Sequence, residues 1–215
     1  MNKYIIFGLL FILGLQLTVF QAKAQSTFKP VQDPTTLKKK LQAESQNTSS
    51  IACDFVQERH LLMMTQPIVS NGKFWFKKPA SIRWEYVEPY YYLIILTKRK
   101  VFVKEDNSKQ EYDMSSGNAF QSLGEVMFSF ILGDIDAAEK DYKIEYMESN
   151  QLYYIKMIPK VHQQNKPVRI DMYFEKKDYT LHEIKIFDSE TEYTGIKFLN
   201  KTINGQISNE KFKFK

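Results

Sequence analysis

The sequence contains few of the residues on which most enzymes and metalloproteins depend. Its 215 residues include one cysteine and three histidines, and the histidines stand far apart in the chain. There is no Gly-x-Ser-x-Gly motif, no glycine-rich phosphate loop and no Cys-x-x-Cys pair. We therefore expect no enzyme activity, no metal and no cofactor, although a catalytic pair assembled from distant residues stays an open alternative.

The single cysteine, Cys53, limits how the protein can be held together. One cysteine cannot form an internal disulfide, so the fold must depend on its core, for which a chain of this length is sufficient. Cys53 lies in an apolar stretch and is expected to be a small buried hydrophobic residue. It also lies too far downstream to be the modified cysteine of a lipoprotein signal, so we expect a chain that is not itself lipidated.

The chain also lacks a strong excess of charge of one sign. Its formal net charge is +5, and it falls to +3 when Lys3 and Lys23 of the amino-terminal segment are left out. The remaining lysines are interspersed with acidic residues, which is typical of a solvated surface. A nucleic-acid partner is therefore not expected.

The first 24 residues are typical of a secretory signal peptide. Lys3 makes a short positive start, residues 4–20 are almost wholly apolar, and Ala22-Lys23-Ala24 is a small-x-small cleavage site. The alternative is an uncleaved anchor, because the apolar run approaches the ~18 residues that a spanning helix needs. We expect cleavage after Ala24, export, and a single mature domain over residues 25–215.

Short alternating segments separated by turn residues predict that most of the mature chain is β-strand, in a sandwich or a barrel. A weakly amphipathic helix over residues 35–46 precedes them, with Leu37 and Leu41 on one face. Residues 61–70 are either a further strand or an apolar loop. The predicted strands cover residues 51–59, 73–78, 81–86, 90–97, 101–103, 111–114, 143–147, 152–158, 168–175, 181–188, 193–200 and 210–214.

Aromatic side chains gather on one face of the segment 70–86. Asn71-Gly72 predicts a turn into its first strand, in which Phe74, Phe76 and Lys78 share a face, and Pro79 ends that strand. A face of this kind needs a cover. The helix predicted over 119–132, whose apolar residues recur at spacings of three and four, is the first candidate, and the 35–46 helix is the second.

Two interpretations of this face stay open. The helices either close an ordinary packed core, or they leave a hollow that accommodates acyl chains. The high aromatic content of 14% is compatible with both, since it indicates a large core or an apolar cavity. Methionines such as Met63, Met64, Met127 and Met172 favour the hollow slightly, because methionine repacks easily around varied guests.

The motif Gly-x-Phe-Trp-Phe-Lys-Lys-Pro-x-x-Ile-Arg-Trp at 72–84 resembles the outer-membrane lipoprotein carrier (LolA) family. Phe55-Val56-Gln57, Ile-Pro-Lys at 158–160 and the order of elements resemble it over nearly all of the mature chain. The resemblance implies a mainly β fold with α, an incomplete antiparallel β-barrel covered by a helical lid. It also implies a periplasmic chaperone, expected to be a monomer, that receives acylated lipoproteins from an inner-membrane ABC exporter and passes them to an outer-membrane acceptor.

The lipid-binding residues that we predict are apolar side chains of the inner strand faces and of the 119–132 helix. They are Phe55, Phe74, Phe76, Ile82, Trp84, Tyr86, Phe102, Phe120, Leu123, Met127, Phe130, Ile131, Met172, Phe174, Ile184 and Ile186. The resemblance further implies a lid latch at Lys78, where the family often carries arginine. Lysine offers a point charge in place of a planar fork, and a solvated strand end is the alternative role for it.

Three other functions remain open. The same fold could carry another acylated lipid, a glycolipid or a pigment precursor, it could be an envelope sensor or interaction domain with a protein partner, or it could be a hydrolase. Extracted ligand, a stable partner, or activity that depends on one histidine or carboxylate would distinguish them.

Overall fold

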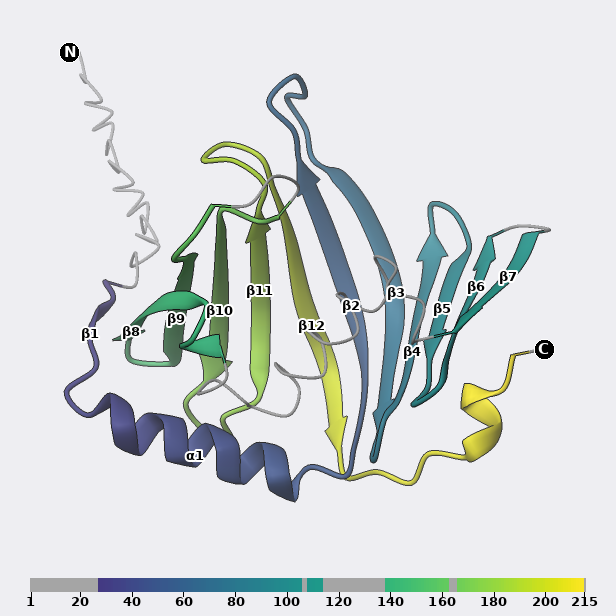
Figure 1. Cartoon of the computed structure of the whole chain (residues 1–215), viewed down its shortest axis with the longest axis horizontal. Helices are drawn as coiled ribbons and strands as arrows, with labels where there is room; N and C mark the ends of the chain where they lie inside the picture. Colours follow the sequence, from purple (N-terminus) through teal and green to yellow (C-terminus); the bar gives the residue numbers. More distant parts are fainter. Residues whose placement is uncertain (1–26, 106–107, 114–137, 163–165, 215) are drawn as a thin grey trace, which may run out of the picture.

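The computed structural model describes residues 27–105, 108–113, 138–162 and 166–214, whose arrangement Figure 1 shows. This part of the chain forms a sheet with an α-helix and a short 3-10 helix. The elements are β1 (Lys29–Pro30), α1 (Pro34–Asn47), β2 (Ser50–His60), β3 (Ile68–Lys77), β4 (Ser81–Glu88), β5 (Tyr92–Leu96), β6 (Lys100–Glu105), β7 (Ser108–Asp113), β8 (Tyr142–Glu148), β9 (Leu152–Pro159), β10 (Arg169–Glu175), β11 (Leu181–Phe187), β12 (Tyr193–Ile203) and the 3-10 helix η2 (Asn209–Phe212).

The strands form a single 12-stranded antiparallel sheet in the order β1-β8-β9-β10-β11-β12-β2-β3-β4-β5-β6-β7. Among the described strands, β1 pairs only with β8 and β7 only with β6, so the sheet curves without closing (Figure 1). The predicted mainly β fold with an incomplete antiparallel barrel is thereby confirmed. The predicted signal peptide over 1–24 and the predicted helix over 119–132 lie outside the described residues.

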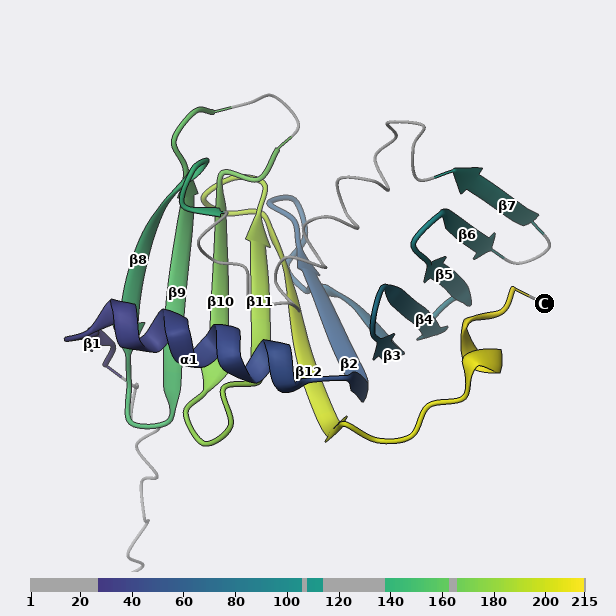
Figure 2. The same cartoon turned by 60° about the horizontal axis from the view of Figure 1, so that its bottom comes forward.

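Helix α1 begins where the sequence supplies a cap. The Asp33 carboxylate accepts hydrogen bonds from the backbone N–H of Thr36 (3.0 Å) and from its hydroxyl (2.6 Å), which satisfies a donor of the first turn. Leu37 and Leu41, one turn apart, are buried, so the helix lies on the sheet by the predicted face. Figure 2 shows α1 crossing β8–β12. Within the described ranges, no helix is long and apolar enough to cross a membrane.

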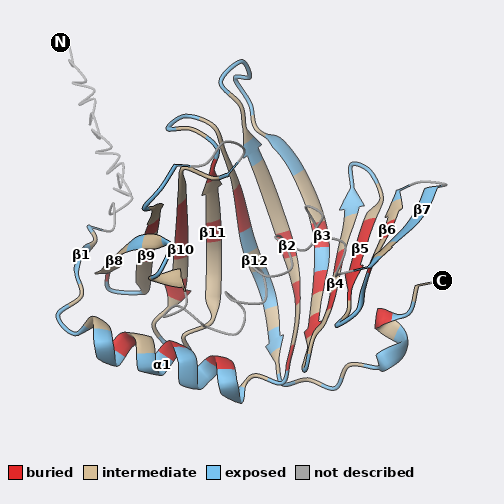
Figure 3. Cartoon of the chain, viewed as in Figure 1, coloured by how far each residue is buried: buried red, intermediate tan, exposed pale blue. Residues whose placement is uncertain are grey.

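The two faces of the sheet have separate apolar clusters. The inner cluster includes Phe74 and Trp84 and receives Leu41 of α1, and Figure 3 shows buried positions along both α1 and the strands. The outer cluster is smaller, and in it Ile95 of β5 is covered by Phe212 of η2. The carboxyl-terminal segment therefore covers the outer face, while α1 lies on the inner one.

The carboxyl terminus differs from the prediction, because residues 210–214 were expected to form a strand and η2 lies there instead. The Ser208 hydroxyl accepts a hydrogen bond from the backbone N–H of Glu210 (3.2 Å) and caps this turn. The Lys77 ammonium donates to the backbone oxygen of Ile207 (2.7 Å) and holds the segment against β3. The polar groups of this segment are therefore satisfied by local hydrogen bonds and need no partner strand. Its alternating apolar residues form a 3-10 turn instead of a strand.

Asn71-Gly72 was also predicted wrongly, as a turn. Both residues lie inside β3, where the register with β4 shifts between them, and the loop that precedes β3 covers 61–67. A Cβ on Gly72 would lie 2.3 Å from the backbone oxygen of Glu85 and 2.3 Å from the ring of Phe55. Glycine is therefore required by close approach, and it lets Phe55 pack flat against the strand.

We expect Gly72→Ala to lower the free energy of unfolding by about 1–3 kcal/mol, because the added methyl group must displace backbone and a buried ring. Gly195→Ala is the matched control, since its Cβ would approach no neighbouring atom closer than 3.7 Å. Urea denaturation of both variants measures the difference. Equal stabilities for the two would contradict the packing that we describe at Gly72.

Candidate functional site

The inner face of the sheet contains a cavity of about 560 Å³. Strands β2–β5 and β10–β12 supply its walls, and the carboxyl-terminal half of α1 borders it. Most of the lining is aliphatic or aromatic, and the volume lies within the ~300–1,000 Å³ range typical of small-molecule pockets. Such a space suits an apolar guest.

The structure brings together most of the predicted lipid-binding residues that it describes. Those that line the cavity are Phe74, Trp84, Tyr86, Phe174, Ile184 and Ile186. Phe55, Phe76, Ile82 and Met172 are buried in the inner cluster and support these walls without lining the cavity. Five further residues, from the predicted 119–132 helix, lie outside the described residues: Phe120, Leu123, Met127, Phe130 and Ile131.

Phe102 is a predicted lipid-binding residue that the structure places elsewhere. It belongs to the outer cluster, where its ring stacks on Phe214 at a centroid distance of 5.0 Å. Its neighbours Val101 and Val103 belong to the inner cluster instead. Because successive residues of β6 point to opposite faces, Phe102 cannot share a face with them.

Aromatic rings form a continuous wall on one side of the cavity. The Trp84 ring lies 4.7 Å from Phe55, 5.3 Å from Phe74 and 6.2 Å from Phe198, measured between centroids. Edge-on and tilted contacts of this kind add ~0.5–1.5 kcal/mol per pair beyond burial. The rings therefore support one another along this wall.

Several lining residues were absent from the prediction. They include Leu41, Ile51, Cys53, Ile94, Leu96, Ile196, Phe198 and Ile203. The signal for some was present, since alternation places Ile51 and Cys53 on the face of Phe55 and places Ile196 and Phe198 together. The run of β5 that includes Ile94 carries apolar residues on both faces, so its pattern could not show which of them face inward.

Two titratable groups of the wall, the Cys53 thiol and the Tyr86 hydroxyl, are held in neutral forms. Burial raises the pKa of the Cys53 thiol to about 12, so it stays protonated and unreactive at neutral pH. Burial also raises the pKa of Tyr86, whose hydroxyl donates to the Gln57 side-chain oxygen (2.9 Å). In the described part of the chain, no group of three or more histidine, cysteine or acidic side chains could hold a metal.

Lys78 follows the last residue of β3 and reaches the carboxyl-terminal end of α1. Its ammonium donates to the backbone oxygens of Ser45 (3.0 Å) and Gln46 (2.6 Å), and its backbone N–H donates to the backbone oxygen of Ser49 (2.9 Å). Carbonyl oxygens at a helix end lack partners within the helix and carry partial negative charge. Lys78 therefore fastens α1, the second of the predicted covers, and a contact with 119–132 lies outside the described residues.

Comparison with known proteins agrees with this arrangement. A family described as "Outer membrane lipoprotein carrier protein LolA" matches residues 46–215. An outer-membrane lipoprotein carrier protein of Methylococcus capsulatus is 27% identical over 130 residues, 60% of this chain and 61% of the relative, so the match spans less than two thirds of that protein. An uncharacterized protein of Rickettsia prowazekii is 28% identical over 167 residues, 77% of this chain and 70% of the relative.

Solved structures share the fold at low sequence identity. An uncharacterized conserved protein of Thermus thermophilus is similar with a TM-score of 0.52 at 8% identity, covering 82% of this chain and 93% of that one. A chain of the MucA/MucB complex of Pseudomonas aeruginosa gives 0.50 at 8% identity, covering 82% of this chain and 59% of that one. These likenesses show a common architecture alone.

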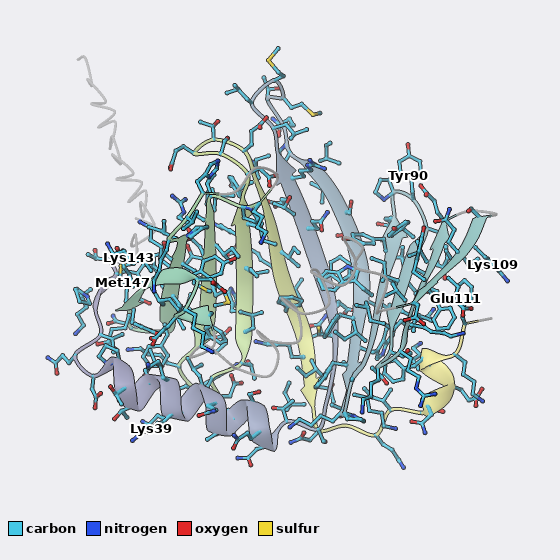
Figure 4. The ribbon with its side chains drawn as sticks, viewed as in Figure 1. Lys39, Tyr90, Lys109, Glu111, Lys143 and Met147 are labelled. Atoms are coloured by element: carbon cyan, nitrogen blue, oxygen red, sulfur yellow. The ribbon has the colours of Figure 1, made fainter. Side chains whose placement is uncertain are left out.

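We expect Lys78→Leu to loosen the carboxyl-terminal turn of α1, because it removes two charge-assisted hydrogen bonds. The loss of stability should be about 1–2 kcal/mol. Amide hydrogen exchange over residues 45–49 should accelerate, while exchange in β9 and β10 stays as in the unmodified protein. Lys39→Leu is the control, since this exposed lysine projects away from the sheet in Figure 4. Unchanged exchange at the helix end would contradict the fastening role.

Proposed function

The chain belongs to the LolA family of outer-membrane lipoprotein carriers, and on this premise we propose that it is a periplasmic chaperone for acylated lipoproteins. It binds the acyl chains of its cargo in the inner cavity and carries them from the inner to the outer membrane. The observation that supports this proposal most strongly is a cavity of about 560 Å³ with an aromatic and aliphatic wall. Such a wall offers a hydrocarbon chain an environment free of water.

The energetics of burial make release the harder part of this task. Burying a methylene group is worth ~0.8 kcal/mol, so a sixteen-carbon chain that left water completely would gain roughly 12 kcal/mol. A carrier has to return its cargo, so some of this free energy must be offset by a rearrangement of the protein. Release of α1 from Lys78 is such a rearrangement, because Leu41 of that helix borders the cavity. This gives Lys78 the role of latch.

The family also supports a set of finer proposals about the route. We propose that a signal peptide is removed after Ala24, that residues 25–215 act as a single domain, and that the mature chain works as a monomer in the periplasm. An inner-membrane ABC exporter supplies the lipoprotein, and an outer-membrane acceptor receives it. The carrier needs no enzyme activity and no cofactor for this, because binding and release alone move the cargo.

Filling the cavity tests the proposal. Ile186 lines the cavity on β11, and Ile186→Trp places an indole where the acyl chain would lie. We expect affinity for the apolar fluorescent probe N-phenyl-1-naphthylamine to fall about tenfold, since the indole displaces roughly two methylenes' worth of contact. Release of lipoproteins from inner-membrane vesicles carrying the exporter should fall in parallel.

Lys197→Trp is the matched control, because Lys197 is exposed on the neighbouring strand β12 and does not line the cavity. It should bind the probe and release lipoproteins as the unmodified protein does. Full lipoprotein release by a correctly folded Ile186→Trp variant would refute the cavity as the cargo site. A stable protein partner together with no probe binding would favour an interaction domain instead.

A further inference from the structure

Strand β12 changes the direction of its side chains close to one end of the cavity. Up to Phe198 it pairs residue for residue with β2, with Phe198 opposite Phe55 and Leu199 opposite Asp54. The pairing then shifts, and Thr202 lies opposite Ala52. Two residues of β12, at 200 and 201, therefore stand opposite the single Cys53, which is the arrangement of a β-bulge.

Asn200 provides the backbone conformation that this bulge needs. Its φ is 52°, in the left-handed region that asparagine tolerates better than most residues. Its side-chain amide donates to the Asp54 carboxylate (2.9 Å) across the strand pair. Without the extra residue, Asn200 would face Cys53 on the inner side and Lys201 would face outward. The bulge therefore turns Lys201 into the cavity, where it lines the wall together with Ile203.

In the part of the chain that the structure describes, the ammonium of Lys201 is hydrogen-bonded to neutral groups. It donates to the Thr180 hydroxyl (2.7 Å) and to the backbone oxygen of Leu181 (3.1 Å) in the turn between β10 and β11. An ammonium has three N–H donors, so a third N–H can donate to a further acceptor. Among the described residues, Lys201 makes no ion pair with a carboxylate. Burial lowers the pKa of Lys201, as expected for a cation removed from water, and Asp178 and Glu175 offset this in part.

Of the residues that the structure describes, Glu44, Asp178 and Asp188 are the acidic ones on the cavity lining. Asp178 influences Lys201 through space, but its carboxylate accepts from the backbone and hydroxyl of Thr180 and so is fixed in the turn. Glu44 and Asp188 are exposed at the rim. Within the described ranges, the charge of Lys201 is therefore left without direct neutralisation beside an apolar space, and an anionic group of a guest would supply it.

We propose that Lys201 binds a carboxylate or phosphate group of an amphiphile whose hydrocarbon chain occupies the apolar part of the cavity. This inference rests on the proposed function, because it assumes that the cavity accepts acyl chains. It adds a chemical preference within that function, namely for an anionic group at the end of the cavity where β12 meets the β10–β11 turn. The preference depends on one side chain, Lys201, which the bulge turns inward. A substitution of Lys201 can therefore remove the preference and leave the cavity in place.

The test compares guests that share a hydrocarbon chain and differ in the head group. Palmitate, hexadecyl phosphate and hexadecanol are each titrated against N-phenyl-1-naphthylamine bound to the delipidated mature protein, and the displacement of the probe gives their affinities. We expect at least one of the two anions to bind about tenfold more tightly than the alcohol, as a charge-assisted hydrogen bond provides. A preference confined to palmitate identifies the carboxylate, and one confined to hexadecyl phosphate identifies the phosphate.

The variants assign the preference to a residue. Lys201→Met should bind hexadecanol and the probe normally and lose the preference for anions, whereas Lys201→Arg should keep it. Lys197→Met, an exposed position on the same strand, is the matched control and should also keep it. The proposal is overturned if the unmodified protein binds all three guests equally, or if folded Lys201→Met retains the preference. Failure of every guest and of the probe to bind would instead refute the proposed function.

Discussion

The curved antiparallel sheet has an apolar inner face that its own strands cannot cover, and the other features of the structure follow from this constraint. A sheet that closed completely could fill its interior with side chains, but here β1 and β7 remain separate edges. Helix α1 lies across β8–β12, and the rings around Trp84 support one another, so the described residues leave a cavity in place of a filled core. A hollow of this kind is the structural requirement for carrying a hydrocarbon guest.

Two lysines bear on how such a hollow can be used, one at the end of α1 and one in the cavity wall. Lys78 holds the carboxyl-terminal turn of α1 through two backbone oxygens, and in the mechanism that we propose this contact breaks when the cover opens. Lys201 places a charge at one end of the cavity, beside the turn that contains Thr180. A strongly apolar wall gives affinity with little selectivity, while a single cation in the wall gives selectivity at a small cost in hydration. We propose that Lys78 acts on the release of the guest and Lys201 on the choice of guest.

The sequence was a good guide wherever the alternation or the helical spacing of apolar residues was clear. Period-two patterns placed Phe74 and Trp84 on one face, and the spacing of Leu37 and Leu41 identified the face of α1. Phe102 was misassigned because the predicted strand was confined to 101–103. The lysines that share its face in β6, Lys100 and Lys104, lie just outside that segment. Lys201 was missed for another reason. A bulge adds one residue to the strand and exchanges the faces of the residues that follow it, and the amino-acid composition does not reveal this. Asn200, tolerant of positive φ, was the one local hint.

The central claim is that the cavity holds acyl chains in the cell, and native mass spectrometry of the protein purified without detergent tests it most directly. The account predicts a bound species that survives gentle ionisation and whose fragments contain fatty acyl chains. It also predicts that this species is depleted when the cavity is filled by a bulkier side chain. A protein that carries no acyl-containing molecule after isolation from its own envelope, while folded and with its cavity unaltered, would contradict the account.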